Sequence, residues 1–151
     1  MSAAARAALL TICEGVTPTT LASWPAAFTR RPDDARLEAM VGKSRVLELS
    51  DALEQEYPLT WNSTRRLWVA ECSLRVRYEL GVGVKRETAA AAMGADFRAL
   101  VKAASNGTAW RPSLNQVSIG DRPASFIPVA GAGDVSPAVI MTIPIRYQFY
   151  A

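Results

Sequence analysis

The segment from residue 66 to residue 80 constrains the fold more than any other part of the 151-residue chain. Every second residue in it is apolar or aromatic: Trp68, Ala70, Cys72, Leu74, Val76, Tyr78 and Leu80. Strict alternation over this length predicts a β-strand with one face on a hydrophobic core and the other toward water or a partner. Most strands of globular proteins have about five to six residues. The excess length suggests a role beyond closing a core.

A second alternating segment closes the chain. One face is expected to carry Val139, Met141, Ile143, Ile145, Tyr147 and Phe149. Pro144, on the other face, lacks the N–H that a strand donates to its neighbour. We therefore predict that this strand lies at a sheet edge or bends there.

Two shorter strands are predicted between and before these segments. Ser44 to Ser50 places Leu47 and Leu49 on one face and Glu48 on the other. Trp110 to Gly120 is the second, with three apolar residues that suit a strand. The stretches Asp51 to Asn62 and Asp121 to Pro137 are predicted to be loops, because turn-forming residues dominate them.

Two helices are predicted, over Ala3 to Cys13 and over Glu87 to Ala104. The second has an apolar stripe at helical spacing: Ala90, Met93, Phe97, Leu100, Val101 and Ala104. Between the first helix and the first strand, Thr17 to Pro32 should be an irregular connection anchored by Trp24 and Phe28. Asp33 to Met40 is predicted to form a short helical turn with Leu37 and Met40 inward.

These elements predict an α+β fold, with a mainly antiparallel sheet and two helices packed on one face. Half of the residues are hydrophobic and 21% are charged, which is typical of an ordered globular protein. No linker or repeat divides the chain, so residues 1–151 are expected to form a single domain.

Little in the sequence points to catalysis. The chain has no histidine, which removes the most common acid–base group and metal ligand. Cys13 and Cys72 fit no metal-ligand spacing, and Cys72 is expected to be a buried free thiol. Carboxylates cluster at Asp33-Asp34 and over residues 51–56; loop solvation explains them, with a carboxylate-only hydrolase or metal site as the alternative. We expect no enzyme, catalytic residue, metal or cofactor.

The N-terminus lacks the long apolar core of a secretion signal, and no apolar run approaches the ~18–20 residues of a membrane span. A soluble protein made in the cytoplasm, without a membrane partner, is the expectation.

The polar face of the long strand is the main candidate interface. Arginines alternate there with glutamates, and the net charge of the whole chain is only +3. This pattern favours ion pairs across strands or subunits. The subunit-interface candidates are Glu71, Arg75, Arg77 and Glu79. An ordinary solvated face and a nucleic-acid contact are the alternatives.

Tyr57 and Trp61 are candidates for docking a partner, because aromatic residues are enriched at interface hot spots. The alternative is that both fold back into a local core.

The order of these elements resembles the tail terminator (tail completion) proteins of long-tailed phages. The resemblance rests on the N-terminal helix, the strand Arg45 to Leu49 and the long strand Arg66 to Tyr78. It continues with a helix around Asp96, Phe97 and Leu100 and a final strand ending Ile143-Pro144-Ile145-Arg146-Tyr147. It covers most of the chain.

The resemblance implies a small α+β subunit that assembles with itself into a ring, expected to be a hexamer, at the head-proximal end of the tail. One side of the ring would cap the tail tube and stop its polymerisation, and the other would meet the head-tail connector or a head-completion protein. Residues 51–62 would dock the tube protein, and DNA would only pass through the lumen. The expected location is the virion.

Two further hypotheses stay open. Another neck or head-tail joining subunit would share this architecture. A small nucleic-acid-binding module, from a different class, would use the basic strand face.

Overall fold

The protein is described by a computed structural model over residues 2–18, 20–21, 23–57, 66–81, 84–106, 114–129 and 137–150. Its helices are α1 (Ser2–Glu14) and α2 (Arg86–Ala104), with a 3₁₀ turn at Leu37–Ala39. Its strands are β1 (Thr29–Arg30), β2 (Val46–Leu49), β3 (Leu53–Glu56), β4 (Leu67–Glu79), β5 (Gln116–Ile119), β6 (Ser125–Val129) and β7 (Ala138–Tyr150). Both predicted helices are confirmed, and each of the four predicted strands contains an observed one; of the strand predicted over residues 110–120, residues 110–113 lie outside the described residues.

These described strands form one seven-stranded sheet in the order β1-β2-β4-β7-β5. On the side of β4 away from β7, β2 and β3 pair with successive parts of β4. On the side of β7 away from β4, β6 and β5 pair with successive parts of β7. All pairs are antiparallel except β1 with β2, which is parallel. The predicted α+β class with a mainly antiparallel sheet is therefore confirmed.

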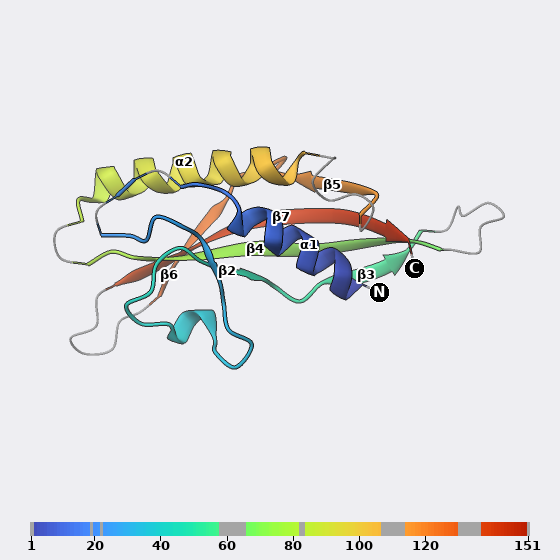
Figure 1. Cartoon of the computed structure of the whole chain (residues 1–151), viewed down its shortest axis with the longest axis horizontal. Coiled ribbons are helices and arrows are strands. Elements are labelled where there is room, and N and C mark those ends of the chain that lie inside the picture. The colour runs from blue at the N-terminus through green and yellow to red at the C-terminus, as the bar shows by residue number, and fades with distance from the viewer. Residues whose placement is uncertain are drawn as a thin grey trace.

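The two long strands form the centre of the sheet (Figure 1). β4 and β7 pair along their whole length, from Leu67 opposite Tyr150 to Glu79 opposite Ala138. This register places the apolar sets of both strands on the same face, as their period-two patterns require.

Both helices contribute to the core over that face. Ala5, Leu9 and Cys13 of α1 and Met93 and Leu100 of α2 join one buried cluster with the apolar residues of β2, β4 and β7. Trp24 and Phe28 are buried in the same cluster, which confirms the predicted anchors of the long connection.

The described residues cover the second face of the sheet only in part. The 3₁₀ turn lies across the sheet from α2 (Figure 1) and buries Leu37 against Val46 and Ile140. Met40, predicted to point inward, is half-buried beside this small second core.

Two segments predicted to be loops contain strands. Residues 53–56 form β3 and residues 125–129 form β6, so the loop prediction is wrong there. Each is short and packs little of its own surface, and each is held by pairing with a long neighbouring strand.

Pro144 does not lie on an edge strand, because β7 is flanked on both sides. Its partner Ser73 directs both backbone groups away from β7: Ser73 N donates to Ser50 Oγ and Ser73 O accepts from Ser50 N. Ser73 and Pro144 therefore form a non-hydrogen-bonded pair, and Pro144 N points to the outer side of β7. No described strand pairs there, because β5 reaches Ile145 and β6 starts at Thr142. The proline occupies the gap between two short strands.

Candidate assembly surfaces

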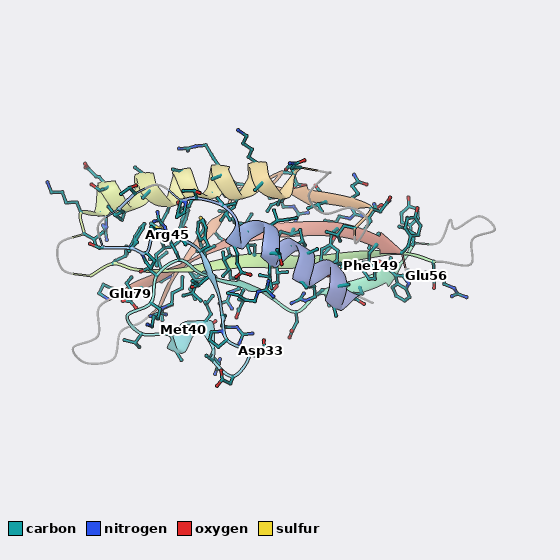
Figure 2. The ribbon with its side chains drawn as sticks, viewed as in Figure 1. Asp33, Met40, Arg45, Glu56, Glu79 and Phe149 are labelled. Atoms are coloured by element: carbon teal, nitrogen blue, oxygen red, sulfur yellow. The ribbon has the colours of Figure 1, made fainter. Side chains whose placement is uncertain are left out.

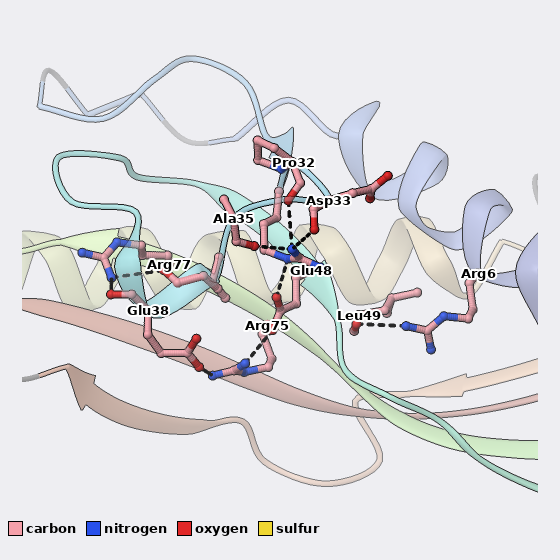
Figure 3. Close-up of polar contacts among 11 residues, drawn as sticks. Arg6, Pro32, Asp33, Ala35, Glu38, Glu48, Leu49, Arg75 and Arg77 are labelled. Carbon is pink, nitrogen blue, oxygen red and sulfur yellow. Dashed lines mark hydrogen bonds and ion pairs between the residues drawn. The ribbon is translucent and has the colours of Figure 1, made fainter.

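The polar face of β4 holds a chain of ion pairs that links it to β2 and to the 3₁₀ turn (Figure 3). Arg75 lies between two carboxylates, with Nη2 2.5 Å from Glu38 Oε1 and Nη1 2.5 Å from Glu48 Oε1. Arg31 Nε lies 2.7 Å from the other oxygen of Glu48. These ion pairs hold residues 31–38 against the second face of the sheet.

Two of these groups, Glu38 and Arg75, have shifted pKa values. The hydrogen bond from Arg75 lowers the pKa of Glu38 below its ordinary value. Burial opposes the charged form of Arg75, but hydrogen bonds and attraction from Glu38 and Glu48 raise its pKa. Both groups are therefore charged at neutral pH.

Arg77 and Glu79 are engaged in the same region. Arg77 is buried, its Nη1 lies 3.1 Å from Glu38 O, and its Nη2 donates to Glu79 Oε1 at 2.7 Å. Glu79 Oε1 also accepts the backbone N–H of Gly42 at 2.9 Å. These contacts hold the segment that follows the 3₁₀ turn.

The four subunit-interface candidates therefore divide into two groups. Arg75, Arg77 and Glu79 make their polar contacts within the chain. Glu71 lies nearer the start of β4. Its side chain is 65% exposed, and its Oε1 lies 4.0 Å from Arg146 Nε. The structure does not gather the four into one surface patch, and an interface role for Glu71 remains a prediction.

The uncovered part of the second face lies at the opposite end of the sheet. In Figure 2, Glu56 and Phe149 mark this end, and Arg45 and Glu79 mark the packed end. A hollow of about 510 Å³ opens here, with Leu53 (81% exposed), Tyr57, Val69, Glu71 and Arg146 in its lining. Tyr57, a predicted docking residue, is exposed at the end of β3. Trp61 lies outside the described residues.

A buried polar group that the sequence patterns did not reveal connects β2, β4 and α2. Arg45 Nε lies 3.0 Å from Asp96 Oδ2, and both side chains are fully buried. Tyr78 donates its hydroxyl to the same carboxylate oxygen at 2.8 Å, and the Trp24 ring lies 5.3 Å from the Arg45 guanidinium carbon. Burial, and then the charge of Asp96, raise the pKa of Tyr78 well above its ordinary value.

Arg45 also has an unusual backbone. Its φ of 56° lies in the left-handed region, which costs free energy for a residue with a side chain. Two backbone hydrogen bonds hold it there: Arg45 N donates to Arg77 O at 2.7 Å, and Arg45 O accepts from Thr29 N at 3.0 Å. Its side chain lies on the same face of the sheet as Leu47 and Leu49, toward α2.

Both cysteines are free thiols. Cys13 is buried, and burial raises its pKa to about 12. Cys72, predicted to be buried, is half-buried at the edge of the core, and its pKa is raised by desolvation to about 11. Both thiols are protonated at neutral pH.

Within the described residues, no three His, Cys, Asp or Glu side chains come together in a group that could hold a metal ion. Neither α1 nor α2 combines the length and apolar composition needed to cross a membrane, among the residues that the structure covers. No protein-family model matches the chain, and no curated protein matches its sequence.

Proposed function

We propose that this protein is a structural subunit of a phage-like tail: a tail terminator whose copies form a ring that caps the tail tube and joins the tail to the head connector. The proposal rests on the order of elements that the sequence shares with that family. The helix, the paired strands, the second helix and the closing strand occur in the expected order.

The observation that best supports an assembly role is the exposed end of the sheet, where β3 and the end of β7 lie; we call it the bare end. Leu53, Tyr57 and Tyr150 are exposed there, whereas Phe149, on the other face of β7, is packed in the main core. Apolar and aromatic side chains grouped on a surface are typical of a contact site. A ring subunit needs such surfaces for its neighbours and for the tube.

The polar contacts on β4 favour assembly over nucleic-acid binding. A basic face that binds phosphates needs arginines that are free to reach them. Arg75 and Arg77 instead bind Glu38, Glu48 and Glu79 within the chain. Another neck or head-tail joining subunit remains the alternative within the same class.

The first experiment locates the protein in assembled particles, by electron microscopy of the particles or by a label on its C-terminus. The terminator proposal predicts a single ring between tail tube and head, and tails of uncontrolled length when the protein is missing. A position along the tube or at the distal tip would contradict it. A ring at the neck combined with normal tail length in its absence would favour a joining subunit.

A further inference from the structure

Within the described part of the chain, the sheet has an unpaired strand edge on β3, at the end marked by Glu56 and Phe149. Tyr57 N donates to Leu67 O, and Gln55 and Leu53 follow opposite Val69 and Glu71. In an antiparallel ladder, hydrogen-bonded and non-hydrogen-bonded pairs alternate. The N–H and C=O groups of Glu54 and Glu56 therefore point away from β4. No described strand pairs with this side of β3.

The other edges among the described strands are very short or protected; the edge strand β1 has only two residues. β1 pairs with part of β2, and Arg6 Nη2 donates to the carbonyl of Leu49 beyond the point where β1 ends. On β6, the alternation directs the backbone of Pro128 outward, and proline offers no N–H to an incoming strand. β5 is short and lies against the last turns of α2. Proteins commonly close strand edges in these ways.

β3 is as short as β5, but it contains no proline, and no described strand pairs with its outer side. Leu53, Glu54 and Gln55 are all exposed, although they point to both faces of the sheet. An extended strand with an unpaired edge accepts a partner strand through its main-chain groups, and the side chains on each face then select the partner.

The side chains of β3 select by charge on one face and by apolar contact on the other. Glu54 and Glu56 lie on the helix face, opposite Ala70 and Trp68, and Asp51 precedes the strand. Arg66 pairs with Glu56 at 3.0 Å, whereas Glu54 has no ion pair among the described residues. On the second face, Leu53 and Tyr57 line the hollow above Val69.

A second copy of β3 is a poor occupant of this edge. Antiparallel pairing of two β3 strands would put glutamates of one copy opposite glutamates of the other on the same face. Like charges placed directly across a strand pair are destabilising. The edge therefore disfavours pairing with a second copy of β3 and favours a strand that carries cationic side chains.

We propose that β3 is the docking edge for an extended segment of another polypeptide that alternates basic and apolar residues. Its basic side chains lie beside Glu54 and Glu56, its apolar side chains lie over Leu53 and the hollow, and its backbone pairs with the outward groups of β3. This inference concerns the chemistry of the partner and does not depend on the protein's place in a tail.

The test uses the full-length protein and two capped six-residue peptides, one alternating lysine and valine and the other glutamate and valine. Amide hydrogen exchange, followed by NMR, reports on the Glu54 and Glu56 N–H groups. We expect the lysine peptide to slow their exchange at least threefold and the glutamate peptide to have no effect.

Two variants sharpen the test. Glu54→Lys combined with Glu56→Lys should reverse the preference, so that the glutamate peptide protects the edge. Glu54→Pro removes an outward N–H without removing a bond to β4, and should weaken binding of the lysine peptide at least tenfold. Unchanged protection of Leu74 and Val76 in the core shows that each variant is folded.

Protection of Glu54 and Glu56 by neither peptide, or by both equally, would overturn the proposal. So would protection of β5 or β6 in place of β3. If Glu54→Pro fails to fold, the charge-reversed variant decides alone, because exposed side chains can be exchanged without changing the ladder. A negative result here leaves the ring position in particles open, and the reverse also holds.

Discussion

Arg45 and Asp96 form an ion pair in which neither side chain is exposed to solvent, with 3.0 Å between Nε and Oδ2. The pair joins the start of β2 to the middle of α2. Arg45 Nη1 also donates to the carbonyl of Pro25 at 2.9 Å, and Tyr78 donates to Asp96. One buried contact therefore connects the long connection, the sheet and the second helix.

Replacing one member of this pair should be costly. Asp96→Ala leaves the arginine charge buried without its counter-ion, and we expect a loss of about 3–5 kcal/mol in the free energy of unfolding. Urea denaturation at pH 7 measures it. In a double-mutant cycle, Arg45→Met with Asp96→Leu should cost less than the sum of the two single variants. Additive costs would mean that the pair is not energetically coupled.

The ion pair between Arg75 and Glu38 predicts a pH-dependent contribution to stability. The pKa of Glu38 is lowered in the folded protein, so its contribution is present above its ordinary pKa and is lost as pH falls through the folded value. Glu38→Gln should reduce the free energy of unfolding by less than about 1 kcal/mol near pH 7, because Glu38 is partly exposed. The difference from the parent protein should disappear in acid.

Urea denaturation of both proteins between pH 3 and pH 7 checks this. Glu87→Gln, at the exposed start of α2 and in no ion pair among the described residues, serves as the matched control. An effect of Glu38→Gln that stays constant across this range would argue against the ion pair as its cause.

Two glycines with the same backbone conformation should respond differently to alanine. Gly42 and Gly120 have φ values of 76° and 78°. A Cβ on Gly42 would meet nothing within 4 Å, whereas one on Gly120 would lie 2.8 Å from Val101 Cγ2. Gly42→Ala should cost about 1–2 kcal/mol from backbone strain alone. Gly120→Ala should cost about 1–3 kcal/mol more, because β5 and α2 must move apart. Thermal or urea unfolding measures both losses of stability. Equal losses for the two variants would show that the contact with Val101 relaxes without a cost in free energy.

The two thiols should react slowly in the folded protein. With pKa values of about 12 for Cys13 and about 11 for Cys72, roughly one thiol in a thousand or fewer is ionised at pH 8. A thiol-specific chromogenic reagent should modify the half-buried Cys72 before Cys13, and both rapidly in urea. Cys72→Ser should remove the faster phase.

The same shifts predict a loss of stability in alkali. Both thiols hold their protons more tightly in the folded state, so the free energy of unfolding should fall as pH rises from about 9, the ordinary pKa of the thiols, toward the folded values of about 11 to 12. Cys13→Ala should reduce this dependence. An unchanged slope would assign the alkaline loss to other groups, such as Tyr78.

The long alternating patterns predicted β4 and β7 well, because period two over many residues fits only a strand with one buried face. β3 and β6 were missed because they are short and carry glutamates or a proline. Their hydrogen bonds come from long neighbours that are distant in sequence, which a local pattern cannot show.

The site was less predictable than the fold. The alternation of β4 predicted that Arg77 is exposed. In the structure the 3₁₀ turn at Leu37–Ala39, which is distant in sequence, covers it. In α2 the predicted stripe included Ala90, which is exposed, and omitted Asp96, which is buried. A helix with alanines on all sides has no clear apolar face, so the buried carboxylate had no signal of its own.

The pairing of β4 with β7 has a mechanical consequence. The two strands run side by side for thirteen residue pairs, from the bare end of the sheet to the end packed under α2 and over the 3₁₀ turn. Their hydrogen bonds lie across the strand direction. A pull on one strand along its length therefore strains all of these bonds together in shear, and none can open first. Tension applied where β3 lies would be passed along this ribbon into the core of the molecule.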